Sequence, residues 1–140
     1  MIWDPLRRKY VALTPEENVR QWFISVLKDE AGVPPGLMRS EVGFSFGEEI
    51  SGLTGVRKKR YRADIVVYDR ALRPVMTVEC KRPEVPLGEE VIRQAMRYNM
   101  VLNVKWLVLT NGTETMLFRR EGDVFVAESN LPKYEEFAVR

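Results

Sequence analysis

A helical repeat of apolar residues dominates the first part of the sequence. Thr14 is a good N-cap, Pro15 suits the first helical position, and Glu17 completes a capping box. Apolar side chains then recur every three or four positions along residues 15–29, and the Gly- and Pro-rich residues 31–36 end the repeat. The pattern predicts an amphipathic helix with one side against a core.

Further along the chain, short apolar runs separated by turn-forming residues are typical of strands. Residues 47–55 hold three glycines and predict a loop, whereas residues 69–74 predict a hairpin connection. The other elements that the pattern predicts are strands at 37–46, 56–68, 75–81, 104–109, 115–119 and 124–127, and a second helix at 89–102.

The predicted order is α-β-β-β-α-β-β, with the last two strands counted as one unit, and it indicates an α/β sandwich. Strand 75–81, helix 89–102 and strand 104–109 predict a right-handed parallel crossover. The nearly continuous apolar run in 104–109 suits a central strand covered on both faces. We therefore expect a central mixed sheet flanked by helices, with Trp22 and Trp106 in the core.

Two of the predicted strands carry charged residues at one end of an otherwise apolar run. Asp64 precedes a β-branched run, and Glu79 and Lys81 close the next strand. Because strand side chains alternate, Glu79 and Lys81 share one face, while Cys80 points to the core. Such charges are costly unless they face a partner, a metal or a cleft. The pattern therefore predicts a chemical site.

The composition limits the chemistry of this site. The chain has one cysteine and no histidine, which excludes internal disulfides, a multi-cysteine zinc site and a histidine-dependent triad. Carboxylates then favour a hard cation, Mg²⁺ or Mn²⁺. No apolar stretch approaches the roughly 20 residues of a membrane span, and the first residues lack a signal-peptide core. We expect one cytoplasmic domain over residues 1–140, without a membrane partner.

A basic segment precedes Asp64, although the net charge of the chain is only +2. One interpretation is a solvated loop and strand edge. The other is a surface that binds DNA phosphates next to the acidic site, which the position beside Asp64 favours. The five cations are Arg57, Lys58, Lys59, Arg60 and Arg62.

These charged residues carry a family resemblance. Asp64 followed by Glu79-Cys80-Lys81 resembles the D…(D/E)-x-K signature of the PD-(D/E)XK nuclease superfamily, and Gln94 with Tyr98 is similar to the Q-x-x-x-Y motif of its RecB-like branch. Five separated motifs, in the expected order, resemble the N-terminal nuclease domain of type I restriction enzyme R subunits. They lie at residues 14–21, 63–67, 78–83, 98–99 and 110–112.

The resemblance implies a restriction-endonuclease-like fold and a set of roles. Asp64 and Glu79 would be the metal ligands, and Lys81 would be the catalytic lysine that orients water and stabilises charge. Gln94 and Tyr98 would contact DNA or support the site. On the plainer interpretation, Glu79 and Lys81 pair with surface neighbours on an exposed sheet face, and Gln94 and Tyr98 mark the boundary of an amphipathic face.

The superfamily also has an acid on its first helix, for which two residues compete here. Glu16 lies three residues before Val19 and so shares the inward-facing side, whereas Glu17 is expected to point away and serve the cap. We therefore choose Glu16. The chain departs from the usual motif at Ala63, where the family commonly has proline.

The leading hypothesis is a magnesium-dependent DNA endonuclease domain that hydrolyses phosphodiester bonds. Because the chain has no P-loop motif or helicase motor, the resemblance implies a separate motor or specificity subunit, or a stand-alone nuclease. A homodimer would allow both strands of a duplex to be cut. One alternative is a catalytically inactive nucleic-acid-binding or scaffolding module of a restriction or defence assembly. Another is a purely structural partner that binds neither DNA nor metal.

Overall fold

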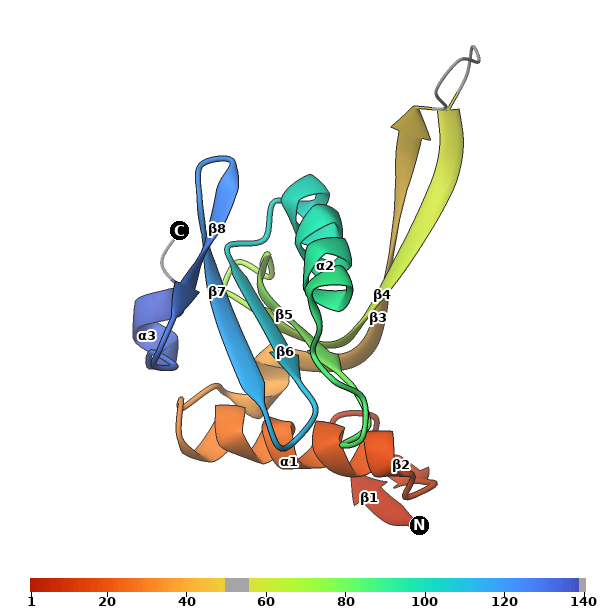
Figure 1. Cartoon of the computed structure of the whole chain (residues 1–140). Helices are drawn as coiled ribbons and strands as arrows, with labels where there is room; N and C mark the ends of the chain where they lie inside the picture. Colours follow the sequence, from red (N-terminus) through yellow and green to blue (C-terminus); the bar gives the residue numbers. More distant parts are fainter. Residues whose placement is uncertain (50–55, 139–140) are drawn as a thin grey trace.

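The computed structural model describes residues 1–49 and 56–138, and its main feature is a six-stranded sheet. The strand order across this sheet is β3-β4-β5-β6-β7-β8, and β1 and β2 form a separate two-stranded sheet (Figure 1). The elements are β1 Ile2–Asp4, β2 Lys9–Val11, α1 Pro15–Asp29, the 3-10 helix η1 Pro35–Leu37, β3 Met38–Glu49, β4 Val56–Tyr68, β5 Pro74–Cys80, α2 Glu89–Leu102, β6 Trp106–Thr110, β7 Thr115–Glu121, β8 Val124–Glu128 and α3 Tyr134–Phe137.

The predicted parallel crossover is present. Strands β5 and β6 pair in parallel and are joined through α2, whereas the other neighbours in the six-stranded sheet pair antiparallel. All residues of β6 are buried, which confirms the prediction of a central strand. The fold is therefore the mixed α/β sheet with flanking helices that the sequence predicts.

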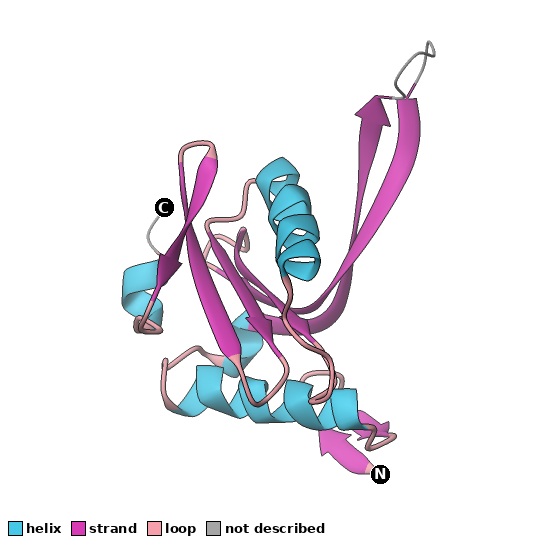
Figure 2. Cartoon of the chain, in the orientation of Figure 1, coloured by secondary structure: helices cyan, strands magenta, loops and turns pink. Residues whose placement is uncertain are grey.

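The two long helices cover opposite faces of the sheet. Leu27 of α1 lies in one core cluster with Met76 and Val78 of β5. Ala95 of α2 lies in another cluster with Leu107 of β6. Because Met76 pairs with Trp106 in the register, Leu107 points to the opposite face from Met76. Figure 2 shows α1 below the sheet and α2 packed across it.

Strands β3 and β4 continue beyond the rest of the sheet as a long two-stranded arm (Figure 2). Their pairing reaches Glu49, opposite Val56. Residues 47–49 therefore belong to β3 rather than to the loop that the glycines of 47–55 predict, because β4 supplies a pairing partner for this stretch. The rest of the predicted loop, residues 50–55, lies outside the described residues.

The alternation of side chains between the two faces of the arm is interrupted near Glu41 and Asp64. Tyr61 of β4 belongs to a cluster with Tyr98 of α2, whereas Ile65, also odd-numbered, belongs to the core beneath α1. Glu41 falls opposite Asp64 in the register and has a φ of 55°, which is uncommon for a residue with a side chain. Asp64 thus lies where the arm leaves the body of the sheet.

The tryptophans and the short elements mark where the sequence interpretation departs from the structure. Trp106 is buried as predicted, but Trp22 is 43% exposed and the prediction of a core position is wrong. The neighbouring Phe23 takes the buried position, because the stripe of α1 that meets the sheet passes one residue further along.

The elements β1, β2 and α3 were not predicted, because three or four residues carry no measurable period. Within the described ranges, no helix has the length and hydropathy to cross a membrane.

Candidate active site

Asp64 is a buried carboxylate beside the end of β5. Its Oδ2 atom accepts a hydrogen bond from the backbone N–H of Cys80 at 2.7 Å, which joins the two strands beyond their ladder. Its Oδ1 atom lies 3.8 Å from Nη2 of Arg20 on α1. Burial raises the pKa of Asp64, although the Cys80 N–H and the Arg20 charge act in the opposite direction.

Glu79 and Lys81 share one side of the chain, as the strand alternation predicts. Cys80 between them is buried beneath α1, and burial raises the pKa of its thiol, so it has the character of a core residue. The Nζ atom of Lys81 lies 3.7 Å from Oε1 of Glu79. Burial raises the pKa of Glu79, Lys81 opposes this shift, and the charge of Asp64 adds to it.

Glu16, the acid chosen on the first helix, lies close enough to influence both carboxylates. Its negative charge contributes to the raised pKa of Asp64 and to that of Glu79. It is half-buried in the first turn of α1. The fold therefore brings Glu16, Asp64, Glu79 and Lys81 together from α1, β4 and the end of β5.

The expectation that Glu17 points away from the core is wrong. Glu17 is only 6% exposed, and its carboxylate accepts hydrogen bonds from Arg7 at 2.7 Å and from Gln21 at 2.9 Å. The Oγ1 atom of Thr14 accepts the backbone N–H of Glu17 at 3.0 Å, so the N-cap is confirmed. The carboxylate of Glu17, however, binds these two side chains, because the β1–β2 hairpin brings Arg7 over the start of α1.

Arg20 is a residue of the site that sequence reasoning missed. Its guanidinium is buried and lies 3.5 Å from Glu17, 3.4 Å from Glu41 and 3.8 Å from Asp64. The available signal was an arginine directly after Val19, on the apolar side of α1. That signal identifies a buried charge but not its partners, which come from other elements.

Tyr98 and Gln94 have different surroundings on α2. Tyr98 is buried and stacks on Tyr61 of β4, with ring centroids 4.7 Å apart and an interplanar angle of 14°. Burial, and next the charge of Glu79, raise the pKa of the Tyr61 hydroxyl. Gln94 is exposed. Tyr98 therefore supports the arm next to the acids, and the DNA contact of Gln94 stays a prediction.

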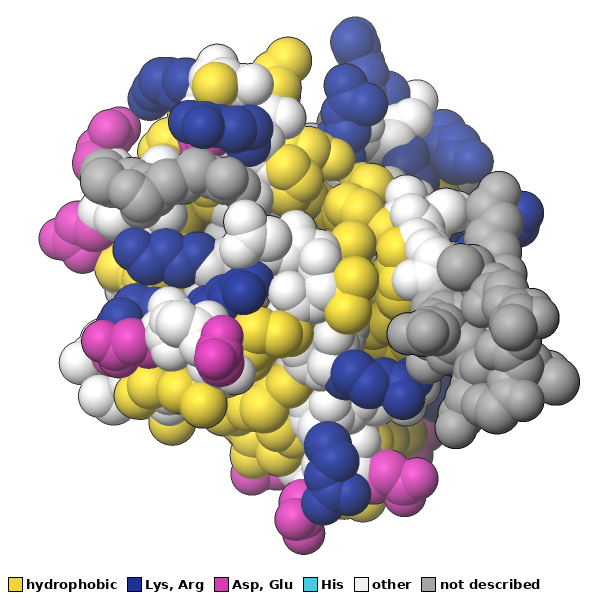
Figure 3. Space-filling model, turned by 90° about the horizontal axis from the view of Figure 1, so that it is seen from above, with side chains coloured by type: hydrophobic (Ala, Val, Ile, Leu, Met, Phe, Trp, Pro, Cys, Tyr) yellow, Lys and Arg dark blue, Asp and Glu magenta, His cyan; other side chains and the backbone are white. Residues whose placement is uncertain are grey.

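The basic segment is divided between the two faces of the arm. Arg60 and Arg62 are exposed and point away from the face that carries Tyr61, whereas Lys59 is half-buried on the Tyr61 side. The side chains of Arg57 and Lys58 lie outside the described part of the structure. Figure 3, the view from above Figure 1, shows Lys and Arg side chains scattered over this face of the molecule, with apolar side chains between them.

The chemistry of the site suits a hard divalent cation. Asp64 and Glu79 are oxygen donors of the kind that Mg²⁺ and Mn²⁺ prefer. Burial disfavours their negative charges, so a cation would relieve an existing cost. Over residues 1–49 and 56–138, no group of three or more His, Cys, Asp or Glu side chains is arranged to hold a metal ion. A cation here would therefore use two carboxylates and complete its coordination with water or phosphate oxygens.

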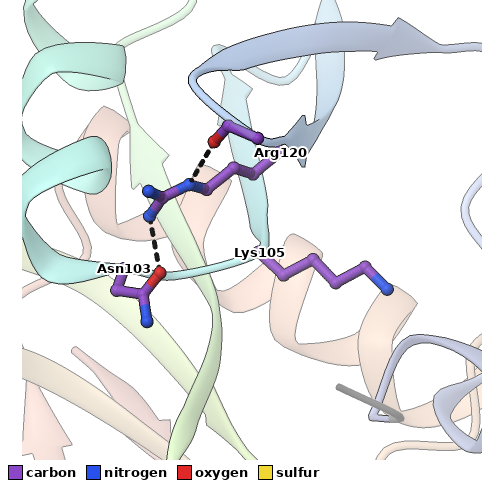
Figure 4. A pocket seen from close by; sticks show the side chains of 4 residues that line it. Asn103, Lys105 and Arg120 are labelled. Atoms are coloured by element: carbon purple, nitrogen blue, oxygen red, sulfur yellow. Dashed lines mark hydrogen bonds between the residues drawn. The ribbon is translucent and has the colours of Figure 1, made fainter.

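A separate pocket of about 370 Å³ lies between the end of α2 and the β7–β8 turn, lined by Asn103, Lys105, Arg120 and Gly122. The guanidinium of Arg120 donates to Oδ1 of Asn103 at 2.7 Å and to the carbonyl of Gly122 at 3.0 Å (Figure 4). The side chain of Lys105 extends away from Arg120 in the same view (Figure 4). Arg120 therefore holds the β7–β8 turn to the end of α2.

The sequence comparisons identify one protein family. The model of the family described as type I restriction enzyme R protein N terminus (HSDR_N) matches residues 15–132. This range includes α1, the arm, the crossover and both strands that carry the acids. No curated protein matches the chain.

Among solved structures, the chain is similar to a fragment of a protein described as an HsdR subunit of a type I restriction enzyme from Vibrio vulnificus YJ016. The TM-score is 0.62 and the identity 23%, over 91% of this chain and 25% of that one. The chain thus shares the fold of that fragment and spans about a quarter of its length. A second structure, of SSO0001, has a TM-score of 0.46 and 15% identity over 80% of this chain and 48% of that one.

Proposed function

This chain belongs to the family of type I restriction enzyme R protein N termini, and from that premise we propose that it is a metal-dependent DNA endonuclease domain. The reaction is hydrolysis of phosphodiester bonds. The observation that carries the proposal is the meeting of Asp64, Glu79 and Lys81 at one point of the fold, with Glu16 arriving from α1. An unrelated surface ion pair would not require this convergence of buried and half-buried charges.

Each of these residues has a role in the proposed reaction. Asp64 and Glu79 hold the cation, Mg²⁺ or Mn²⁺, which supplies Lewis acidity toward the scissile phosphate when bound. Lys81 lies within 3.7 Å of Glu79 and is 33% exposed, so its ammonium can reach a phosphate at the site. There it steadies developing negative charge and orients the attacking water. Glu16 adds to the negative potential that attracts the cation.

The surroundings of the acids suit a polyanionic substrate. Arg60 and Arg62 are exposed on the arm and would contact DNA phosphates. Gln94 is exposed on α2 and would reach the DNA, while the buried ring of Tyr98 keeps α2 against the arm. A type I system has several subunits, so we expect a motor or specificity subunit as a partner and action in the cytoplasm.

The decisive experiment is a DNA cleavage assay with Mg²⁺ or Mn²⁺. Supercoiled, linear and single-stranded DNA are incubated with the wild-type chain, Asp64→Asn and Lys81→Met. Each variant should lose at least about a hundredfold in rate, as expected when one charge-stabilising group is removed. Matched controls are Asp123→Asn and Lys28→Met, which change exposed residues of the same types and should cleave like the wild type.

The remaining outcomes of this assay discriminate between functions. Equal cleavage by the wild type, Asp64→Asn and Lys81→Met would overturn the assignment. Salt-sensitive DNA binding without cleavage under either cation would instead indicate a non-catalytic binding module.

A further inference from the structure

A second group of charged side chains lies directly behind the candidate site and joins it to the β1–β2 hairpin. We propose that Arg7 and Arg20 position Asp64 for its cation, so that the hairpin is a functional part of the site. The inference rests on the proposed function, because it takes Asp64 to be a metal ligand. Arg7 lies outside residues 15–132, the range that the family model matches.

Arg20 attracts the carboxylate of Asp64 without a hydrogen bond to Oδ1, the oxygen that Cys80 does not bind. The distance of 3.8 Å between Nη2 of Arg20 and Oδ1 of Asp64 is that of an ion pair and exceeds a hydrogen bond. The other oxygen, Oδ2, is already bound to the N–H of Cys80. The carboxylate is thus held from two sides while Oδ1 keeps its lone pairs for a cation.

Arg20 itself is held by charge. Its Nε and Nη1 atoms are buried and make no hydrogen bond within the part of the chain described, but they lie 3.5 Å from Glu17 and 3.4 Å from Glu41. Side-chain exposure is only 5% for Arg20 and 7% for Glu17. In such surroundings charges attract strongly, and moving one acid would move the guanidinium.

Arg7 contacts two of the three acids that lie near Arg20, namely Glu17 and Glu41. Its Nη2 atom donates to Glu17 at 2.7 Å, and its Nη1 atom lies 3.4 Å from Oε1 of Glu41. Its Nε atom donates to Asp4, which is fully buried and also accepts the N–H of Leu6 at 2.9 Å. A continuous chain of charge contacts therefore runs from the hairpin to Asp64.

The network suits the support of a cation site. Two arginines face four carboxylates, so the network keeps a net negative charge while each buried acid has a cationic neighbour. Groups that orient a metal ligand from behind typically contribute about tenfold to a hundredfold in metal affinity. The carboxylates of this network are Asp4, Glu17, Glu41 and Asp64.

The experiment measures Mn²⁺ affinity of the full chain by isothermal titration calorimetry, without DNA. Arg7→Gln should weaken Mn²⁺ binding by about tenfold, and Arg7→Lys, which keeps the charge but loses the fork, by about threefold. The matched control is Arg8→Gln, because Arg8 is exposed and adjacent and the same charge is removed. Its Mn²⁺ affinity should stay within about twofold of the wild type.

The direction of the change separates positioning from simple electrostatics. If Arg7 were only a nearby positive charge, its removal would tighten Mn²⁺ binding, because a repulsive charge is lost. Unchanged or tighter binding by Arg7→Gln therefore overturns the inference while leaving the proposed function intact. If circular dichroism shows that Arg7→Gln is unfolded, the Mn²⁺ affinity of Arg7→Lys is the deciding measurement. An Arg7→Lys variant that binds Mn²⁺ as tightly as the wild type overturns the inference. A wild-type chain that binds no Mn²⁺ overturns both.

Discussion

Asp64 and Glu79 are carboxylates whose surroundings disfavour their charged form. Burial is the largest cause of the raised pKa of each, and the charge of Glu16 contributes to both shifts. Each group therefore ionises less readily in the folded chain than in the unfolded chain. This cost is unusual for residues kept only for stability, and it is the physical reason to expect a cation between them.

The pH dependence of stability follows from these shifts. A group with a raised folded pKa contributes stability that is fully present below its unfolded pKa and is lost as the pH rises through the folded pKa. Without metal, the free energy of unfolding should therefore fall as the pH rises above the ordinary carboxyl values of 3.8 for Asp64 and 4.5 for Glu79. The free energy of unfolding of Asp64→Asn should fall less over this range. This variant should therefore be more stable than the wild type near pH 7.

Urea unfolding in EDTA, from about pH 4 to about pH 8, measures this effect. Asp123→Asn is the control, since Asp123 is exposed in the β7–β8 turn. A wild-type chain that gains stability over this range, together with a destabilised Asp64→Asn, would contradict the prediction.

The start of α1 is an element whose geometry matters to the site, because Glu16, Glu17 and Arg20 all depend on it. The hydroxyl of Thr14 accepts the N–H of Glu17 and satisfies one of the free donors of the first turn. Thr14→Ala should lower the free energy of unfolding by about 1 kcal/mol, the usual value of an N-cap. Chemical denaturation provides the measurement, and Thr113→Ala, at an exposed turn, should be nearly neutral.

The β3–β4 arm is the second element with a functional expectation. If Arg60 and Arg62 contact phosphates, changing both to Gln should weaken DNA binding for every sequence and reduce the slope of log affinity against log salt by about two. Fluorescence anisotropy over a range of salt concentrations gives this slope. Changing Arg8 and Arg70, which are exposed in the β1–β2 and β4–β5 turns, should leave the slope unchanged.

At the level of the whole molecule, metal binding should be linked to folding. A cation that binds the native state alone stabilises it by about 2.7 kcal/mol at a concentration of 100 times its Kd. Mn²⁺ should therefore raise the Tm of the wild type, and Glu79→Gln should lose most of this increase. Glu84→Gln, at an exposed acid on the loop after β5, should keep it. A Tm increase of equal size in both variants would place the stabilising cation elsewhere.

Much of the fold could be predicted because its signals are local. Helical and strand periods identified α1, α2 and β4 at their observed boundaries, and the alternation in β5 placed Glu79 apart from Cys80. The buried face of the first helix was harder to predict. Trp22 and Phe23 are adjacent and both aromatic, so the sequence does not reveal which of them meets the sheet. Likewise, the glycines of 47–55 suggest a loop that begins at residue 47, whereas pairing with β4 keeps residues 47–49 in β3.

Local periodicity was sufficient for the order of the elements, the parallel crossover and the shared side of Glu79 and Lys81, because a residue's own neighbours along the chain set these features. The burial of Glu17 and the meeting of Arg20 with Asp64 depended instead on how distant segments pack. Such contacts bring charged residues of different elements together, and their energies arise only when folding excludes water from between them.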